Sequence, residues 1–199
     1  MEKQVIISIS REYGSGGHDI AMRVAEELSM PMYDRSLLQE IADQMDMDVN
    51  ELKQYDERPR NHLLTRTVGK HTNSMEEILI ERQFDWIREK AKSGESFVIV
   101  GRCAETVLRE FSGLIPVFIT GDADYKVKRI MGYSSLDEAK ARAEQVKIDR
   151  KRRVYHNRYS DHKWGDSRYY DLVMNGSHLG VDGTADEIIH YIRARIAVM

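Results

Sequence analysis

The sequence has a single cysteine, Cys103, among its 199 residues. One cysteine excludes an intrachain disulfide and a cysteine-based metal cluster, so we expect a protein of a reducing compartment, the cytoplasm. No stretch approaches the roughly 18 apolar residues that a membrane-spanning helix needs, which predicts no membrane partner. Residues 5–7 are apolar, but neither a basic region nor a cleavage site accompanies them, so no secretory signal is predicted.

An excess of positive charge is also lacking. Lysine and arginine total 30 against 33 acidic residues, for a net charge of −3, which excludes a global polycation built to bind nucleic acid. The chain is 41% apolar and 32% charged with only 3 prolines, a composition typical of a soluble, helix-rich globular protein. Its length favours one domain over two.

Apolar residues alternate along the chain between strand-like and helix-like spacing. Strands are predicted at residues 4–10, 32–33, 97–100, 115–120 and 172–174. One helix is predicted to begin at about residue 18, and another to follow Asp34 as its N-cap. Further helices are predicted at 74–91, 104–109 and 122–159, the last with a break at 132–134. A final helix is predicted to follow Thr184 as its N-cap. Residues 48–73 indicate a short helix and a connection. Strands separated by helices predict an α/β protein with a parallel sheet covered on both faces.

A glycine loop follows the first predicted strand. Gly14, Ser15, Gly16 and Gly17 precede a helix that opens near His18. Backbone N–H groups converge on an anion in such a strand–loop–helix, so the segment predicts a phosphate site; the alternative is a plain tight turn.

The loop departs from the strict pattern G-x-x-x-x-G-K-[ST]. Arg11 stands at its first glycine, Gly17 at the lysine and His18 at the hydroxyl residue. The lysine normally holds the transferring phosphates, and the hydroxyl normally binds magnesium. Either Arg11, His18 or a distant arginine supplies the missing charge, or the loop binds phosphate without transferring it.

Positive charge is concentrated in one predicted helix. Residues 147–158 hold six lysines and arginines and one acid, a net +5, which leaves −8 on the rest of the chain. Such a local charge suits a polyphosphate. The predicted phosphate contacts are Arg152 and Arg153, with Arg150 next. The alternatives are a solvated basic face or a nucleic-acid patch, which is the least favoured partner.

Several segments together resemble the cytidylate-kinase-like family of P-loop nucleoside monophosphate kinases, over nearly the whole chain. They are residues 10–17, Tyr33-Asp34-Arg35, Val100-Gly101-Arg102, the basic helix at 149–159, Trp164-Gly165-Asp166 and residues 170–175. True cytidylate kinases carry the loop lysine, so this chain resembles a divergent branch with glycine in its place. The resemblance implies a three-layer α/β/α P-loop NTPase fold over residues 1–199, with a helical acceptor-binding region at about 35–95 and a basic lid at about 133–165.

The resemblance also implies roles for individual residues. Arg11 and residues 14–18 are expected to bind the donor phosphates, with Mg²⁺ bridging them, while Asp34, Arg35 and Arg102 are expected to face the acceptor nucleotide. Arg102 follows a buried strand at the carboxyl edge of the sheet, where ligands of open α/β folds bind; the alternative is a surface arginine paired to an acid.

Two functions remain open at this point. The first is transfer of the γ-phosphoryl group of a nucleoside triphosphate to a nucleoside monophosphate or another small acceptor. The second is nucleotide binding or sensing without catalysis. The histidines lack a shared metal-ligand spacing, so no structural metal is expected, and Cys103 is expected to be a small packed residue. The oligomeric state is not predicted.

Overall fold

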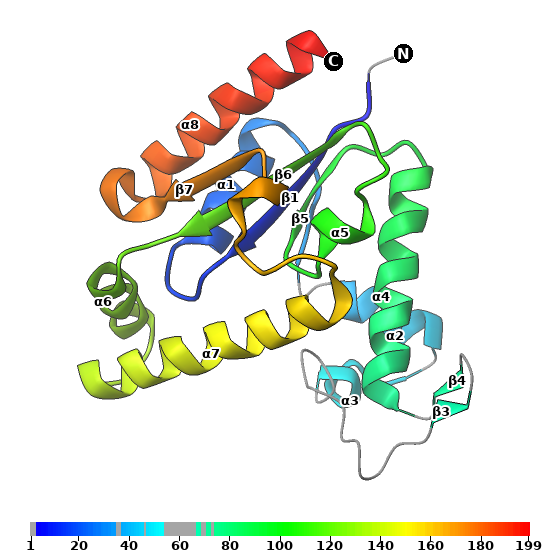
Figure 1. Ribbon diagram of the computed structural model, residues 1–199, viewed down its shortest axis with the longest axis horizontal. Helices are drawn as coiled ribbons and strands as arrows, with labels where there is room; N and C mark the ends of the chain where they lie inside the picture. The colour runs from blue at the N-terminus through cyan, green and yellow to red at the C-terminus, as the bar shows by residue number, and fades with distance from the viewer. Residues whose placement is uncertain (1–2, 35–36, 46, 54–66, 69–70, 73) are drawn as a thin grey trace.

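The computed structural model describes residues 3–34, 37–45, 47–53, 67–68, 71–72 and 74–199 (Figure 1). Five parallel strands form its main sheet, which confirms the predicted α/β fold. In spatial order they are β2 (Met32–Tyr33), β5 (Phe97–Val100), β1 (Ile6–Arg11), β6 (Leu114–Thr120) and β7 (Leu172–Asn175).

Strand β1 lies at the centre of the sheet. Its residues 6–10 are buried, as expected for a strand covered on both faces. Ile9 pairs with Val100 of β5 on one side and with Val117 of β6 on the other. The carboxyl ends of the three strands therefore lie side by side at one edge of the sheet.

Helices cover both faces and form the two outer layers (Figure 1). On one face, α1 (Gly17–Glu27) and α8 (Gly176–Val198) pack on side chains such as Ile7 and Ile9. On the other, α2 (Leu37–Met45), α4 (Met75–Lys92) and α5 (Ala104–Val107) pack on Phe97 and Ile99. The alternation of Ile6, Ile7 and Ile9 between the two clusters follows from the two-residue period of a strand.

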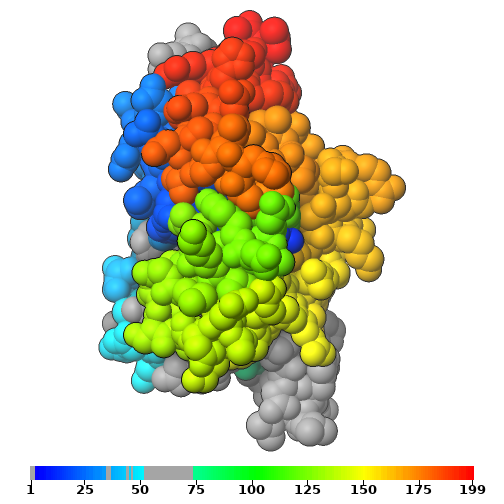
Figure 2. Space-filling model, turned by 90° about the vertical axis from the view of Figure 1, so that its left-hand side faces the viewer, coloured from blue at the N-terminus to red at the C-terminus, as the bar shows by residue number. Residues whose placement is uncertain are grey.

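Two further helices, α6 (Ala123–Tyr133) and α7 (Glu138–Tyr159), lie beyond the carboxyl ends of the strands (Figure 1). In Figure 2 this segment, green to yellow, covers the surface next to the orange α8. A break between two helices is confirmed, but it lies at residues 134–137, because Gly132 and Tyr133 still belong to α6. Asp137 caps the second helix by accepting from the Lys140 N–H at 2.9 Å.

The structure corrects the predicted start of the last helix. Thr184 is not an N-cap: α8 begins at Gly176, and the Thr184 hydroxyl donates back to the Gly180 carbonyl at 2.5 Å. Gly180 is non-helical (φ 66°), so the chain kinks four residues before Thr184, where the sequence suggested a start.

The segment from 48 to 73 holds the predicted short helix, α3 (Val49–Lys53). It also holds two strands that were not predicted, β3 (Thr67–Val68) and β4 (His71–Thr72), which pair antiparallel. A 3₁₀ turn at Ser167–Tyr169 precedes β7. None of the helices in the described part of the chain is both long and apolar enough to cross a bilayer.

Two glycines test the packing of this fold. A Cβ on Gly113 would collide with the backbone carbonyl of Gln4, whereas a Cβ on Gly132 of α6 would meet no atom of the described residues within 4 Å. We expect Gly113→Ala to lower the free energy of unfolding by about 2 kcal/mol or more, and Gly132→Ala to raise it by about 0.5–1 kcal/mol. Urea unfolding of both variants measures this; equal effects would contradict the close approach at Gly113.

Candidate active site at the carboxyl edge of the sheet

The glycine loop joins β1 to α1, as predicted. Gly14 and Gly16 both have positive φ, 84° and 86°, which explains glycine at these two positions. A Cβ on Gly14 would also lie 2.7 Å from the backbone carbonyl of Lys126. The buried Ser15 hydroxyl donates to the Glu12 carbonyl at 2.9 Å, so this side chain fixes the loop from within.

A pocket of about 530 Å³ opens at the loop. The loop residues Arg11, Gly14, Gly16, Gly17 and His18 line it, together with Asp34, Arg102 and Arg152 from distant parts of the sequence. The structure thus brings these predicted site residues together. The volume of the pocket is typical of a small-molecule site.

Two hydrogen bonds join helix α7 to the loop. The Tyr13 N–H donates to Asp149 Oδ1 at 2.7 Å, and Arg152 Nη1 donates to the Arg11 carbonyl at 3.1 Å. The Arg152 guanidinium also lies over the Tyr13 ring, 5.7 Å from its centroid. The basic helix therefore places Arg152 in the pocket.

The other two predicted lid contacts lie elsewhere in this structure. Arg153 is exposed, with its guanidinium over the Trp164 ring at 5.7 Å, and Arg150 is exposed to solvent. Neither is among the described residues that line the pocket. The reason is helical geometry, since Arg152 and its two neighbours at 150 and 153 point in different directions around α7.

Asp34 and Arg102, two residues predicted to face the acceptor, both line the pocket and contact other side chains. His18 Nε2 lies 2.9 Å from Asp34 Oδ2. Arg102 is buried, so it is not a surface arginine, and its Nη1 donates to Gln83 Oε1 at 3.0 Å. Arg35 lies outside the described residues.

Two basic residues of α6 also reach the loop, and the sequence reading missed them. Lys126 Nζ lies 2.7 Å from Glu12 Oε2 and 4.0 Å from Asp149 Oδ2, while Arg129 lines the pocket and contacts Asp19 at 2.6 Å. Their spacing of three residues puts both on one face of α6, a signal that the sequence does contain.

Burial raises the pKa of Asp149 above the ordinary carboxyl value, against the opposing effects of the Tyr13 N–H, the Gln145 amide and Lys126. The Glu12 carboxylate raises it further. The positive charge of Lys126 therefore balances the carboxylates of Glu12 and Asp149 at the point where the loop, α6 and α7 meet.

Comparison with known proteins decides the family. A model of the cytidylate kinase-like family matches residues 6–178. The chain belongs to the cytidylate kinase-like family. Curated cytidylate kinases are also similar to this chain. That of Pyrobaculum aerophilum is 27% identical over 183 residues, covering 89% of this chain and 87% of the relative. That of Pyrobaculum islandicum is 26% identical over 191 residues, covering 94% and 92%.

Solved structures agree with a kinase fold. An uncharacterised protein from Eubacterium ventriosum is 40% identical, with a TM-score of 0.76 over 96% of this chain and 99% of its own. Shikimate kinase from Bacteroides thetaiotaomicron is 14% identical, with a TM-score of 0.57 over 95% and 98%. The latter likeness shows the fold alone, and that fold is the one that P-loop kinases share.

Within this cytidylate kinase-like chain, Lys126 should contribute strongly to the free energy of unfolding. Lys126→Met leaves Glu12 and Asp149 without their cation, so we expect the free energy of unfolding to fall by about 3 kcal/mol at pH 7. The pKa of Asp149 would rise further without Lys126, so the folded protein would bind protons that the unfolded chain does not. Stability of the variant then falls as pH rises through that pKa.

Unfolding in urea at pH 5 and pH 7 measures this difference, which we expect to be larger at pH 7. Lys128→Met is the matched control, because Lys128 is exposed on the same helix and carries the same charge. A Lys126→Met loss that does not depend on pH would contradict the coupling to Asp149.

Proposed function

We propose that the chain is a phosphotransferase that moves the γ-phosphoryl group of ATP to a nucleoside monophosphate. The observation that carries the proposal is the convergence of four arginines, from four parts of the chain, on a pocket at the glycine loop. These arginines are Arg11, Arg102, Arg129 and Arg152. The names of the Pyrobaculum relatives suggest cytidylate as the first acceptor to test.

The residues of the pocket match the demands of phosphoryl transfer. An oxygen of the acceptor phosphate attacks the γ-phosphorus, the bond to the ADP oxygen breaks, and the negative charge moves to the β-phosphate of ADP. The acceptor oxygen is already anionic, so positioning and charge neutralisation carry the rate. Amides at the start of α1 suit the donor phosphates, and arginines suit bidentate contacts with both substrates.

Magnesium fits the donor set of this pocket only in part. Asp19 and Asp34 line it and offer carboxylate oxygens, the ligand type that Mg²⁺ prefers, but His18 stands where a hydroxyl ligand is usual. We propose that Mg²⁺ enters with ATP and lies near Asp19 and Asp34. When bound, the ion would reduce the negative charge of the phosphates. Asp34 would then exchange its contact with His18 for one with the ion.

Arg11 is the residue best placed to replace the loop lysine. A Cβ on Gly17 would lie 2.5 Å from Arg11 Cβ and 2.9 Å from its Cγ, so the Arg11 stem occupies the space of a side chain at position 17. A Cβ on Gly101 would lie 2.5 Å from Arg11 Nη1. Gly17 is not in the left-handed region, so this close approach, and not backbone conformation, explains glycine there. In the usual pattern, glycine stands at the first position and lysine at the later one. Here the two are exchanged: Arg11 supplies the positive charge at the first position, and Gly17 is the glycine at the lysine position.

A coupled assay of ADP formation tests the function. With ATP, Mg²⁺ and a panel of nucleoside monophosphates, we expect turnover above the acceptor-free rate for at least one acceptor, cytidylate first. Arg152→Ala should lower kcat/KM about 100-fold or more, because it removes a cation from the pocket. Arg23→Ala, an exposed arginine of α1, is the control. Binding of ATP without turnover of any acceptor would overturn transfer and favour a nucleotide sensor.

An exchange of residues tests the role of Arg11. Arg11→Gly should weaken ATP binding and lower kcat/KM about 100-fold. Gly17→Lys alone should destabilise the protein, because its Cβ meets Arg11, whereas Arg11→Gly with Gly17→Lys removes the clash and restores the usual loop charge. We expect the double variant to regain stability and ATP affinity, measured by thermal unfolding and calorimetry. A double variant no better than Arg11→Gly would contradict the exchange.

A further inference from the structure

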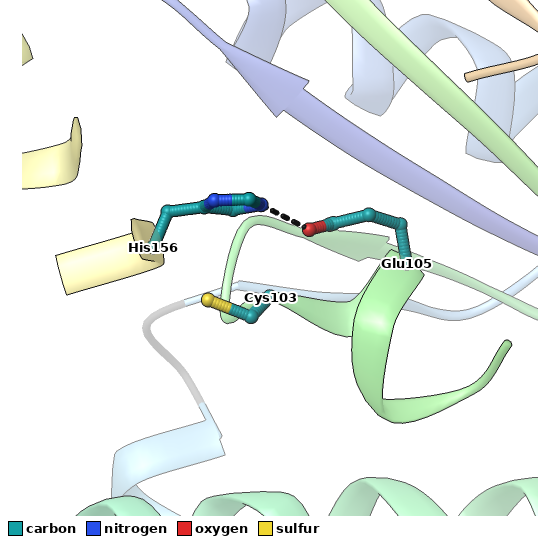
Figure 3. Close-up of side chains that lie close together, drawn as sticks. All are labelled: Cys103, Glu105 and His156. Carbon is teal, nitrogen blue, oxygen red and sulfur yellow. Dashed lines mark hydrogen bonds and ion pairs between the residues drawn. The ribbon is translucent and has the colours of Figure 1, made fainter. Parts of the chain in front are cut away.

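A second cluster of reactive side chains is not among the described residues that line the pocket and takes no part in the proposed transfer. Cys103 at the start of α5, Glu105 within α5 and His156 of α7 point toward one another (Figure 3). The Cys103 sulfur, a Glu105 carboxylate oxygen and a His156 ring nitrogen all lie within 4.8 Å of one another. The three residues are 3%, 4% and 3% exposed, so the cluster is closed to solvent.

The cluster contains more hydrogen-bonding capacity than the described protein atoms satisfy. His156 Nε2 lies 2.7 Å from Glu105 Oε1, but buried His156 Nδ1 has no hydrogen-bond partner among the described residues. The ring of His162, 9% exposed, lies 5.0 Å from that of His156, and within the same ranges its Nε2 is also buried without a partner. Each unsatisfied buried nitrogen is costly, so this buried polar region has hydrogen-bonding capacity that the described residues do not use.

The donor set indicates which ligand. Sulfur, imidazole nitrogen and carboxylate oxygen together are the donors of zinc sites, whereas magnesium and calcium take oxygen alone. The Glu105 carboxylate is also oriented as metal ligands are, since the Ser10 and Thr106 hydroxyls donate to its two oxygens at 3.3 and 3.4 Å.

We propose that Cys103, Glu105 and His156 bind a zinc ion. Three bonds form, from the sulfur, one carboxylate oxygen and one ring nitrogen; the thiol proton leaves to solvent, and the ion replaces the proton between Glu105 and His156. Three protein ligands leave one tetrahedral position for a fourth ligand. The ring of His162 lies 5.0 Å from that of His156.

The position of the cluster gives the ion a structural role. Cys103 directly follows Arg102, and both residues are in the left-handed region, with φ of 51° and 61°. His156 lies one helical turn after Arg152 on α7. Zinc would therefore link the turn that carries Arg102 to the helix that carries Arg152. Spacing in the sequence does not reveal this site, because the ligands come from distant parts of the chain.

Cobalt(II) provides a direct test on the full-length reduced protein. Because Cys103 is the only cysteine, an absorption band from a cobalt–thiolate bond can arise from this residue alone. We expect one equivalent of cobalt to produce that band and zinc to abolish it. Cys103→Ser, nearly the same in size, should fold and lack the band, while His190→Gln, an exposed histidine of α8, should keep it.

Thermal unfolding gives a second readout that does not depend on kinase activity. Zinc at about 100 times its dissociation constant should raise the Tm of the protein by about 5–10 °C, and should raise that of Cys103→Ser much less. Absence of the cobalt band, or equal stabilisation of both proteins by zinc, would overturn the proposal. The trio would then be only a buried hydrogen-bonded contact between α5 and α7.

Discussion

The parallel pairing of β1 with β5 and β6 is the constraint on which the site depends. Because Ile9 is level with both Val100 and Val117, the segments that follow these strands begin at the same edge of the sheet. The glycine loop leaves β1 there, and the turn that carries Arg102 leaves β5 beside it. The glycine loop and the turn that carries Arg102 are therefore brought together by strand register before any side chain contributes.

Arg11 shows how this register is used. It is the last residue of β1, and its side chain passes over Gly17 of its own loop and reaches Gly101 after β5. The two glycines lie on different segments, and the same long side chain lies against both; Gly101 also has a positive φ of 76°, which itself favours glycine. If Arg11 replaces the loop lysine, as proposed above, the positive charge lies at the opposite end of the motif, and a pattern search that requires lysine at position 17 misses it.

The sequence predicted the parts of the fold that depend on local periodicity and the parts of the site that follow strands. The buried run at 97–100 and the glycines at 14–17 are local signals, and the strand and the strand–loop–helix that they predict are confirmed. Lys126 was missed because its importance comes from Glu12 and Asp149, which only the tertiary structure places beside it. Thr184 was misread because a hydroxyl that bonds back to Gly180 resembles a cap in sequence.

The basic helix shows why charge alone predicts a region more reliably than a residue. Helix α7 is held along its length by groups of the body: Asp149 accepts from the Tyr13 N–H, His156 contacts Glu105, and Arg158 pairs with Glu77 at 2.7 Å. These contacts fix the rotation of the helix about its axis, and that rotation directs Arg152 into the pocket while 150 and 153 face away. The acidic and buried residues that anchor α7 therefore decide which of its positive charges can reach the pocket.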